Sequence, residues 1–274
     1  MNIDFPLLLT IAVLLTGLIW LLDVFVLKPS RASADSNGEQ SDEDEPDKEP
    51  LAVEYARSFF PVLLIVWALR SFLAEPFQIP SESMVPTLEV GDFVLVNKYA
   101  YGIRLPVLKT KLIAIGEPAR GDVMVFIPPH KNLYLIKRVV GLPGDVIRYA
   151  NQSLTVNGEP VGYDFVQVVE RDAPFGRFNV REYEEQLDGR GHLIHRYPPD
   201  LIRQPPAREW IVPAGSYFML GDNRDRSEDS RVWGYASDAE IVGKAVAVWM
   251  HKEPGWNLPT FAENRWLSRE ADAE

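Results

Sequence analysis

The feature that most constrains this chain is a long apolar run close to its N-terminus. Phe5 to Leu27 covers 23 residues and includes one charged residue, Asp23. A helix of about 20 apolar residues crosses the hydrocarbon core of a bilayer, so the run predicts a transmembrane helix over residues 5–27. The alternative is a cleavable secretory signal, which has a basic start and an apolar stretch of about 7 to 15 residues. Here the start is Met-Asn-Ile-Asp, which favours a retained anchor.

A second apolar segment, Ser58 to Ala74, has twelve uncharged residues before Arg70 interrupts it. In isolation it fits the core helix of a soluble domain as well as a short membrane span. An arginine near the end of a span extends its charge to the lipid headgroups, and Trp67 is suited to the membrane interface. We therefore expect a second transmembrane helix over residues 58–75.

Basic residues set the orientation of membrane segments, because cytoplasmic loops carry an excess of lysine and arginine. None precedes the first apolar run, and the segment between the two runs contains Lys28, Arg31, Lys48 and Arg57. The linker over residues 28–57 is therefore expected on the cytoplasmic side, with the N-terminus and the remaining chain on the periplasmic side. Its run from Asp42 to Asp47 is too polar to form a core and indicates a solvated spacer.

Composition narrows the classes of function. The net charge is −11, and residues 28–57 supply about half of it with nine acidic against four basic residues, so nucleic acid is a poor partner. The absence of cysteine excludes a catalytic thiol, a cysteine zinc site and disulfides. None of the four histidines stands in an H-E-x-x-H pattern, and His192 and His195 lie three apart in a polar stretch. We expect both to be solvated rather than metal ligands.

Beyond residue 76 the apolar runs are short and rich in β-branched or aromatic residues, which indicates strands. The runs are Phe93 to Val96, Val123 to Ile127, Leu133 to Val140, Val146 to Tyr149, Tyr217 to Leu220 and Ile241 to Trp249. Gly-Asp and Asn-Gly turns separate them. The predicted fold class is mainly β: a β-rich barrel or sandwich preceded by two transmembrane helices. We place the barrel or sandwich at residues 76–150 and 209–250, an inserted second lobe at 151–208 and a C-terminal tail at 251–274.

Two stretches carry candidate catalytic residues. The first, Phe77 to Leu88, contains Ser83 among prolines, where serine is usually a loop former. The second places Lys137 in an apolar β run, where strand alternation can turn it inward, although a lysine on a strand more often faces water. A serine hydroxyl needs a neighbouring base, and a lysine amine with a pKa of about 10.4 becomes one at neutral pH only if burial lowers that pKa. Without cysteine, a G-x-S-x-G elbow or a histidine in these motifs, a Ser83–Lys137 pair is the most economical hydrolytic site.

A third stretch, Gly221 to Gly234, is rich in aspartate and arginine. Its acids suggest a calcium loop, but Arg224 and Arg226 stand where the EF-hand pattern needs oxygen ligands, so we expect no metal. The remaining interpretations are a turn held by Asp–Arg pairs and a support for the catalytic site, and the pattern is compatible with both.

These three stretches, in this order and behind two membrane segments, resemble bacterial signal peptidase I, or leader peptidase, a Ser-Lys dyad peptidase family. The resemblance rests on Pro80 to Met84, Lys137-Arg138 and Gly221 to Gly234, and it covers nearly the whole chain except the insertion. It implies a membrane-bound serine endopeptidase that cleaves N-terminal signal peptides from exported preproteins after small-x-small, Ala-x-Ala-like sites, without a cofactor. It also implies a multi-pass protein of the bacterial inner membrane, whose partners are signal peptides, membrane lipid and, transiently, the secretion translocon.

The resemblance also implies roles for individual residues. Ser83 is the nucleophile and Lys137 the general base, and the oxyanion hole is formed by the Ser83 backbone N–H and the Ser81 hydroxyl. The residues that orient the lysine or brace the site are Ser227, Asp222, Asp229, Arg138 and Arg231. The residues that line the substrate pockets are Ile79, Met84, Leu88 and Ile136 in the nearer one and Phe77, Val94 and Val125 in the farther one. Glu82 and Leu135 stand where the family often has glycine and tyrosine, which leaves the fine specificity open.

Two other functions fit parts of the pattern. A Ser-Lys self-cleaving repressor resembles this fold, but such a protein is cytosolic with a DNA-binding head, and the two membrane segments argue against it. A non-catalytic membrane-assembly factor built on the same ectodomain is the second alternative. The presence of both Ser83 and Lys137 argues against that alternative, and a turnover assay on a preprotein distinguishes it from a peptidase.

Overall fold

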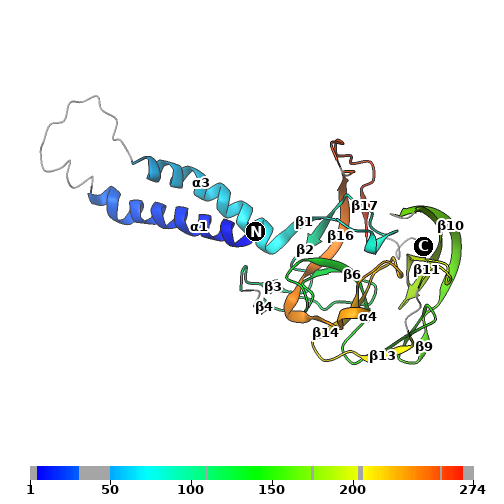
Figure 1. Cartoon of the computed structure of the whole chain (residues 1–274). Coiled ribbons are helices and arrows are strands. Elements are labelled where there is room, and N and C mark those ends of the chain that lie inside the picture. The colour runs from blue at the N-terminus through cyan, green and yellow to red at the C-terminus, as the bar shows by residue number, and fades with distance from the viewer. Residues whose placement is uncertain are drawn as a thin grey trace, which may run out of the picture. The chain divides into compact units, whose positions relative to one another are not determined.

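The structure, a computed structural model, describes residues 5–30, 50–108, 110–173, 176–202, 206–253 and 255–267. The chain divides into two compact units, Met1–Leu73 with Arg104–Leu108 and Ala74–Ile103 with Lys109–Glu274. The first unit holds two long helices, and the second holds nearly all of the strands (Figure 1). The predicted fold class, mainly β behind two N-terminal helices, is confirmed. Most of the predicted linker, including its acidic run, lies outside the described residues.

The two helices are long and apolar. They are α1 (Phe5–Leu22), which continues as the π-helical η1 (Asp23–Leu27), and α3 (Leu51–Ala68), which continues as the π-helical η2 (Leu69–Leu73). The segments Phe5–Ser30 and Leu51–Leu73 are long and apolar enough to cross a membrane, and few of their residues are buried by protein. Their exposed apolar surfaces are suited to a lipid environment.

The two helices contact each other through aromatic and small residues. Trp20 and Phe60 stack with ring centroids 5.4 Å apart, and a Cβ added to Gly17 would lie 2.8 Å from the Phe60 ring. The indole N–H of Trp67 donates a hydrogen bond of 3.0 Å to the Thr10 hydroxyl. Glycine at position 17 therefore lets the helices approach closely, as small residues do in membrane helix pairs.

The second helix begins earlier than the sequence pattern predicts. It starts at Leu51, directly after Pro50, rather than at Ser58. The first N–H groups of a helix have no partner within it, and Pro50 lacks an N–H, so a helix begins readily at this point. The prediction followed the apolar run and therefore left out about two helical turns, which carry Glu54 and Arg57.

An eight-stranded sheet forms the centre of the second unit, with strand order β1-β2-β16-β5-β6-β14-β15 and with β17 paired to β16. Its strands are β1 (Ala74–Gln78), β2 (Asp92–Asn97), β5 (Val123–Phe126), β6 (Leu135–Gly141), β14 (Ser216–Leu220), β15 (Ala236–Ser237), β16 (Ile241–His251) and β17 (Arg265–Trp266). These strands pair in antiparallel fashion. β16 comes late in the chain but lies between β2 and β5 in the sheet. It therefore connects β2, which follows the serine motif, to the pair β5 and β6, of which β6 carries the lysine motif.

Three smaller sheets accompany it, with strand orders β13-β7-β8-β9, β10-β11-β12 and β3-β4. Their strands are β3 (Ile103–Arg104), β4 (Lys111–Ile113), β7 (Val146–Ala150), β8 (Ser153–Val156), β9 (Glu159–Pro160), β10 (Tyr163–Ala173), β11 (Gly176–Leu187), β12 (Arg190–Arg196) and β13 (Arg208–Ile211). The short helical turns are η3 (Glu82–Met84), α4 (Ser230–Trp233) and η4 (Asp238–Glu240). The predicted insertion at 151–208 contains the whole β10-β11-β12 sheet, whereas β8 and β9 within it extend the sheet of β7. Its boundaries as a lobe remain predictions.

The central strand β5 is apolar on both of its faces. Val123 and Val125 belong to one buried cluster, and Met124 and Phe126 belong to another. A strand that is covered on both sides shows a continuous apolar run instead of alternation. The neighbouring strand β6 carries Lys137, and only 3% of the surface of this lysine is exposed.

The prediction that His192 and His195 are solvated is wrong. Both lie on β12, and only 3% and 1% of their surfaces are exposed. Each faces a glutamate of β11: His192 Nε2 lies 3.3 Å from Glu185, and His195 Nε2 lies 3.0 Å from Glu182. The stretch is polar in sequence, but its polar side chains pair with one another in the interior, which a hydropathy pattern does not reveal.

Gly141→Ala should destabilise the fold, because a Cβ there would lie 2.8 Å from the Cβ of Phe218 and 2.9 Å from Cγ1 of Ile147 in the core. Overpacking of this kind typically costs about 1–3 kcal/mol, so the midpoint of thermal unfolding in detergent should fall. Gly162→Ala is the matched control, because nothing lies within 4 Å of a Cβ at that position. Equal midpoints for both variants and the parent would contradict this packing.

Candidate active site

Ser83 lies in a short helical turn that is anchored by apolar side chains. The turn η3 belongs to the loop between β1 and β2, whose base is closed by hydrogen bonds between Ile79 and the Gly91–Asp92 pair. Met84 and Leu88 are fully buried, and the Leu88 N–H donates to the Met84 carbonyl at 2.9 Å. The backbone around Ser83 is therefore fixed on both sides.

Lys137 lies on β6, and its side chain contacts the Ser83 hydroxyl. Its Nζ lies 2.6 Å from Ser83 Oγ and 2.9 Å from the Ile136 carbonyl oxygen. Pairing of Met124 with Lys137 in the β5-β6 ladder holds the lysine backbone in place. A nucleophile and a base within hydrogen-bond reach are the arrangement that hydroxyl activation requires.

Burial lowers the pKa of Lys137 from 10.5 to about 8, while the negative charges of Asp229, Asp222 and Glu228 act in the opposite direction. Only 3% of the lysine surface is exposed. The ammonium form loses most of its hydration there, and this loss outweighs the attraction of the three carboxylates. A fraction of the amine is consequently neutral near pH 7 and able to accept a proton.

Ser81 is the second hydroxyl at this position. Its Oγ lies 3.5 Å from Ser83 Oγ. A donor so close to the nucleophile is suited to bind an oxygen that develops negative charge beside it. The Ser83 backbone N–H is the other donor that the sequence predicts for this task.

The first brace joins all three motifs. The Arg138 guanidinium binds both carboxylate oxygens of Asp222, at 2.9 and 2.7 Å, and Thr87 donates to the same carboxylate at 2.5 Å. Burial raises the pKa of Asp222, but the charge and hydrogen bonds of Arg138 more than offset this and hold it below its usual range. Thr87, which sequence reasoning did not single out, follows Ser83 by four residues and connects the serine motif to this ion pair.

The second brace lies within the third motif. Arg231 donates to both oxygens of Asp229 at 2.8 Å, and the Gly221 N–H donates to Asp229 Oδ2 at 3.1 Å. Asp229 also caps α4, because it accepts a hydrogen bond from the Arg231 N–H at 3.3 Å. These hydrogen bonds connect Gly221, at the start of the loop, to Asp229 and Arg231 near its end.

Asn223 is a site residue whose role sequence reasoning missed. Its backbone N–H donates to the Ser83 carbonyl at 3.2 Å, and its side-chain amide donates to the Glu82 carbonyl at 3.1 Å. A Cβ on Gly221 would overlap the Ser83 carbonyl and Ser227. The third motif therefore packs directly on the backbone of Ser83, and the adjacency of Asn223 to Asp222 was the available signal.

Ser227, which was expected to orient the lysine, makes no hydrogen bond to it. Within the described part of the chain, its buried Oγ has no hydrogen-bond partner. The lysine amine is held by Ser83 and Ile136 instead. An orienting role for Ser227 stays a prediction.

The seven predicted pocket residues lie together. Ile79, Met84, Leu88, Val94 and Val125 belong to one buried cluster, and Phe77 and Ile136 pack against it. Phe77 and Ile136 are partly exposed, so the cluster reaches the protein surface at these two side chains. Beside Phe77, the Tyr134 ring packs edge-on with centroids 5.2 Å apart.

Glu82 is paired away from the lysine. Its carboxylate lies 3.2 Å from Arg226 Nη1, and 44% of its side chain is exposed. Solvent and Arg226 both screen its charge, so its influence on Lys137 is small.

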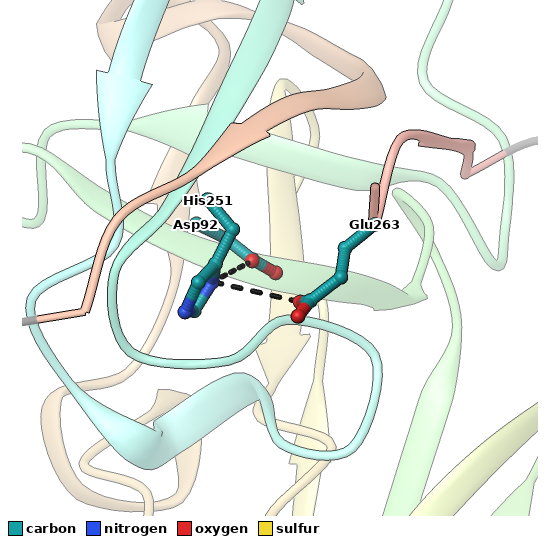
Figure 2. A group of neighbouring side chains, drawn as sticks. All are labelled: Asp92, His251 and Glu263. Atoms are coloured by element: carbon teal, nitrogen blue, oxygen red, sulfur yellow. Dashed lines mark hydrogen bonds and ion pairs between the residues drawn. The ribbon is translucent and has the colours of Figure 1, made fainter. Parts of the chain in front are cut away.

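One other group of side chains has the geometry of metal ligands. Asp92, His251 and Glu263 converge so that one potential ligand atom of each lies within 4.8 Å of the others (Figure 2). His251 Nδ1 lies 2.8 Å from Asp92 Oδ1, and Arg265 donates to Asp92 Oδ2 at 2.7 Å. The guanidinium of Arg265 already pairs with the buried carboxylate of Asp92, and these bonds connect β2, β16 and the tail. That the protein binds no metal remains a prediction.

Comparison with known proteins gives consistent matches. A family model described as signal peptidase, peptidase S26, matches residues 52–250. Signal peptidase I of Pseudomonas aeruginosa is 53% identical over 283 residues, which cover 96% of this chain and 98% of that protein. Signal peptidase I of Pseudomonas fluorescens is 50% identical with the same coverage of 96% and 98%. Signal peptidase I of Haemophilus influenzae is 36% identical and covers 91% of this chain and 86% of that protein.

Lys137→Met should stabilise the fold below pH 8. The folded state depresses the pKa of Lys137 from 10.5 to about 8, which corresponds to about 3 kcal/mol of destabilisation below pH 8, where the group is protonated in both the folded and the unfolded chain. Between these two pH values the unfolded chain binds the extra proton, so the stability of the parent rises with pH and the advantage of the variant shrinks. The measurement is the thermal unfolding midpoint in detergent from pH 7 to 10.

Lys131→Met is the control for this series, since its side chain is 41% exposed and pairs with Glu228 at the surface. Its midpoint should differ from that of the parent by little at every pH. A Lys137→Met effect that is constant between pH 7 and 10 would contradict the burial argument.

Proposed function

Because the chain belongs to the signal peptidase I family, peptidase S26, whose activity is the cleavage of signal peptides, we propose that it cuts them with Ser83 as nucleophile and Lys137 as general base. The observation that supports this assignment is the 2.6 Å approach of Lys137 Nζ to Ser83 Oγ at a buried position. The chain has no cysteine, and the carboxylates of the third motif that are buried beside the lysine, Asp222 and Asp229, are each paired with an arginine.

In the acylation step, the neutral amine of Lys137 takes the hydroxyl proton as Ser83 Oγ attacks the carbonyl carbon of the scissile peptide. The carbonyl oxygen becomes an oxyanion, which accepts hydrogen bonds from the Ser83 N–H and the Ser81 hydroxyl. The lysine ammonium then gives its proton to the leaving nitrogen, the C–N bond breaks, and the new N-terminus of the mature protein departs.

Deacylation uses the same base. The regenerated neutral amine of Lys137 takes a proton from water, which attacks the ester carbon, and the tetrahedral intermediate collapses as Ser83 Oγ recovers a proton from the lysine. The braces at Asp222 and Asp229 hold the loop and the strand during both steps, so that neither reacting atom has to be repositioned.

We propose cleavage after small-x-small sites on steric grounds. The pocket residues form a packed cluster in which only Phe77 and Ile136 are partly exposed. Shallow apolar surfaces of this kind accept small side chains and reject large ones. Signal peptides of exported preproteins are the substrates that this preference fits.

The proposed location is the bacterial inner membrane. The two apolar helices support anchoring, and the basic residues between them favour a cytoplasmic linker. The active site would then face the periplasm, where preproteins emerge, and contact with lipid and transient contact with the secretion translocon follow from this placement.

Ser83→Ala and Lys137→Met should each abolish cleavage, with a loss in kcat on the order of 10⁴ or more, because both belong to one proton-transfer unit. The double variant should lose no more than either single variant. The assay is incubation of the full chain in detergent with an exported preprotein, followed by N-terminal sequencing of the product. Substantial cleavage by either variant with the fold intact would refute the pair, and an inactive parent would favour a non-catalytic assembly factor.

The pH profile gives an independent test. Since the deprotonated lysine is the active form and its pKa is about 8, kcat/KM should fall about tenfold per pH unit below pH 8. Glu228→Gln removes a negative charge that raises the pKa of Lys137, so the acid limb should move to lower pH, by less at high salt. Glu159→Gln, an exposed change elsewhere, should leave the limb in place. An acid limb that stays in place in Glu228→Gln at low salt would show that this charge does not reach the base.

A further inference from the structure

We propose that Glu185, on β11 of the β10-β11-β12 sheet, is a positioning residue for the nucleophile: it fixes Arg224, and through Arg224 the turn from Gly221 to Asn223 that holds the backbone of Ser83. This inference rests on the proposed function, because it concerns the geometry of the same Ser83–Lys137 pair. It gives the inserted sheet a task in catalysis.

The Glu185–Arg224 contact is bidentate and completely buried. Arg224 Nη1 donates to Glu185 Oε1 at 2.6 Å, its Nη2 donates to Oε2, and neither side chain has exposed surface. The third guanidinium nitrogen, Nε, donates to the Gly221 carbonyl at 3.2 Å. The planar guanidinium is held at Nη1 and Nη2 and therefore has one orientation, so the Glu185 carboxylate determines where Nε of Arg224 contacts the turn.

The same sheet also binds the turn through backbone groups. On β12, the His195 N–H donates to the Asp222 carbonyl at 2.9 Å, and the His195 carbonyl accepts from the Arg224 N–H at 3.0 Å. The turn then donates from Asn223 to the carbonyls of Ser83 and Glu82. A continuous set of hydrogen bonds therefore runs from β11 and β12 to the nucleophile.

The turn transmits small displacements because it has no free space. A Cβ on Gly221 would overlap both the Ser83 carbonyl and Ser227, so the backbone of the turn rests against that of Ser83. A shift of the turn must accordingly move Ser83 relative to Lys137, which is anchored separately on β6.

The buried Glu185–Arg224 pair is better suited to positioning the turn than to stabilising the fold. Two charges removed from water gain little net free energy, and apolar side chains of similar size stabilise a fold as well or better. Around Glu185 the other groups are Arg196, 3.8 Å away, and His192, 3.3 Å away. Burial, and next the charge of Arg138, lower the pKa of His192, so this histidine is neutral at pH 7 and Arg224 remains the close charged partner of Glu185.

The test is a double-mutant cycle on the full chain in detergent, with preprotein cleavage as the assay and near-UV circular dichroism to verify folding. Glu185→Gln keeps the shape but removes the charge that orients Arg224. We expect kcat to fall at least tenfold with little change in KM, since a misplacement of about 1 Å costs about a hundredfold. If Glu185 acts through Arg224, the double variant Glu185→Gln/Arg224→Met should lose no more kcat than Arg224→Met alone.

Glu182→Gln is the matched control. Glu182 lies on the same strand, is buried and bonds the side chains of His195 and Gln167, without contact to the turn. It should lower the unfolding midpoint but leave kcat within about twofold of the parent, because the Glu182 carboxylate bonds His195 only at the side chain, whereas the backbone of His195 binds the turn. An equal loss of kcat in Glu182→Gln, or additive losses in the cycle, would overturn the positioning role.

Two further variants complete the design. If Glu185→Gln does not fold, Glu185→Asp retains the charge but shortens the reach to Arg224, and kcat should fall at least threefold; parent-like turnover in Glu185→Asp would overturn the proposal. Ser83→Ala, assayed in parallel, separates the two hypotheses. Cleavage by Ser83→Ala refutes the proposed function, whereas an inactive Ser83→Ala beside a fully active Glu185→Gln refutes only the role of Glu185.

Discussion

The amine of Lys137 is held in a dehydrated position 2.6 Å from the Ser83 hydroxyl, and the surrounding strands and loops hold this contact in place. Dehydration is what brings the lysine pKa down to about 8 and gives the amine basic character near neutral pH. Such burial needs a strand that is covered on both faces. The central sheet provides it, because β5 and β6 lie between two separate apolar clusters.

Carboxylates near this amine oppose its deprotonation, and the structure limits the effect of the two buried ones by pairing them with arginine. Asp222 is bound by Arg138 and Asp229 by Arg231, each through two hydrogen bonds. The loop of the third motif thereby gains rigid cross-links at a modest electrostatic cost to the base. A carboxylate left without its arginine would favour the ammonium form more strongly and would also lose its fixed position.

The β10-β11-β12 sheet meets the rest of the unit in two physically different ways. A partly exposed pair, Arg171–Glu89, joins it at the surface, where solvent reduces the pair to a small contribution. The Glu185–Arg224 pair is fully buried and lies beside the backbone of the catalytic loop. The surface pair holds the sheet near the site, whereas the buried pair fixes the positions of atoms in the loop of the third motif.

The sequence by itself determined what local pattern controls. Two apolar runs are long enough to span a bilayer, short β-branched runs between turns form strands, and the motifs around Ser83 and Lys137 indicate the family. The helix start at Leu51 and the interior of β11 and β12 escaped it, because neither is marked by an apolar run. Only the tertiary structure decided which polar groups are buried and paired, since Ser83 and Lys137 are 54 residues apart and Glu185 and Arg224 are 39 apart. A polar strand gives no local sign of its buried face, because the charge that makes burial possible comes from a distant segment of the chain.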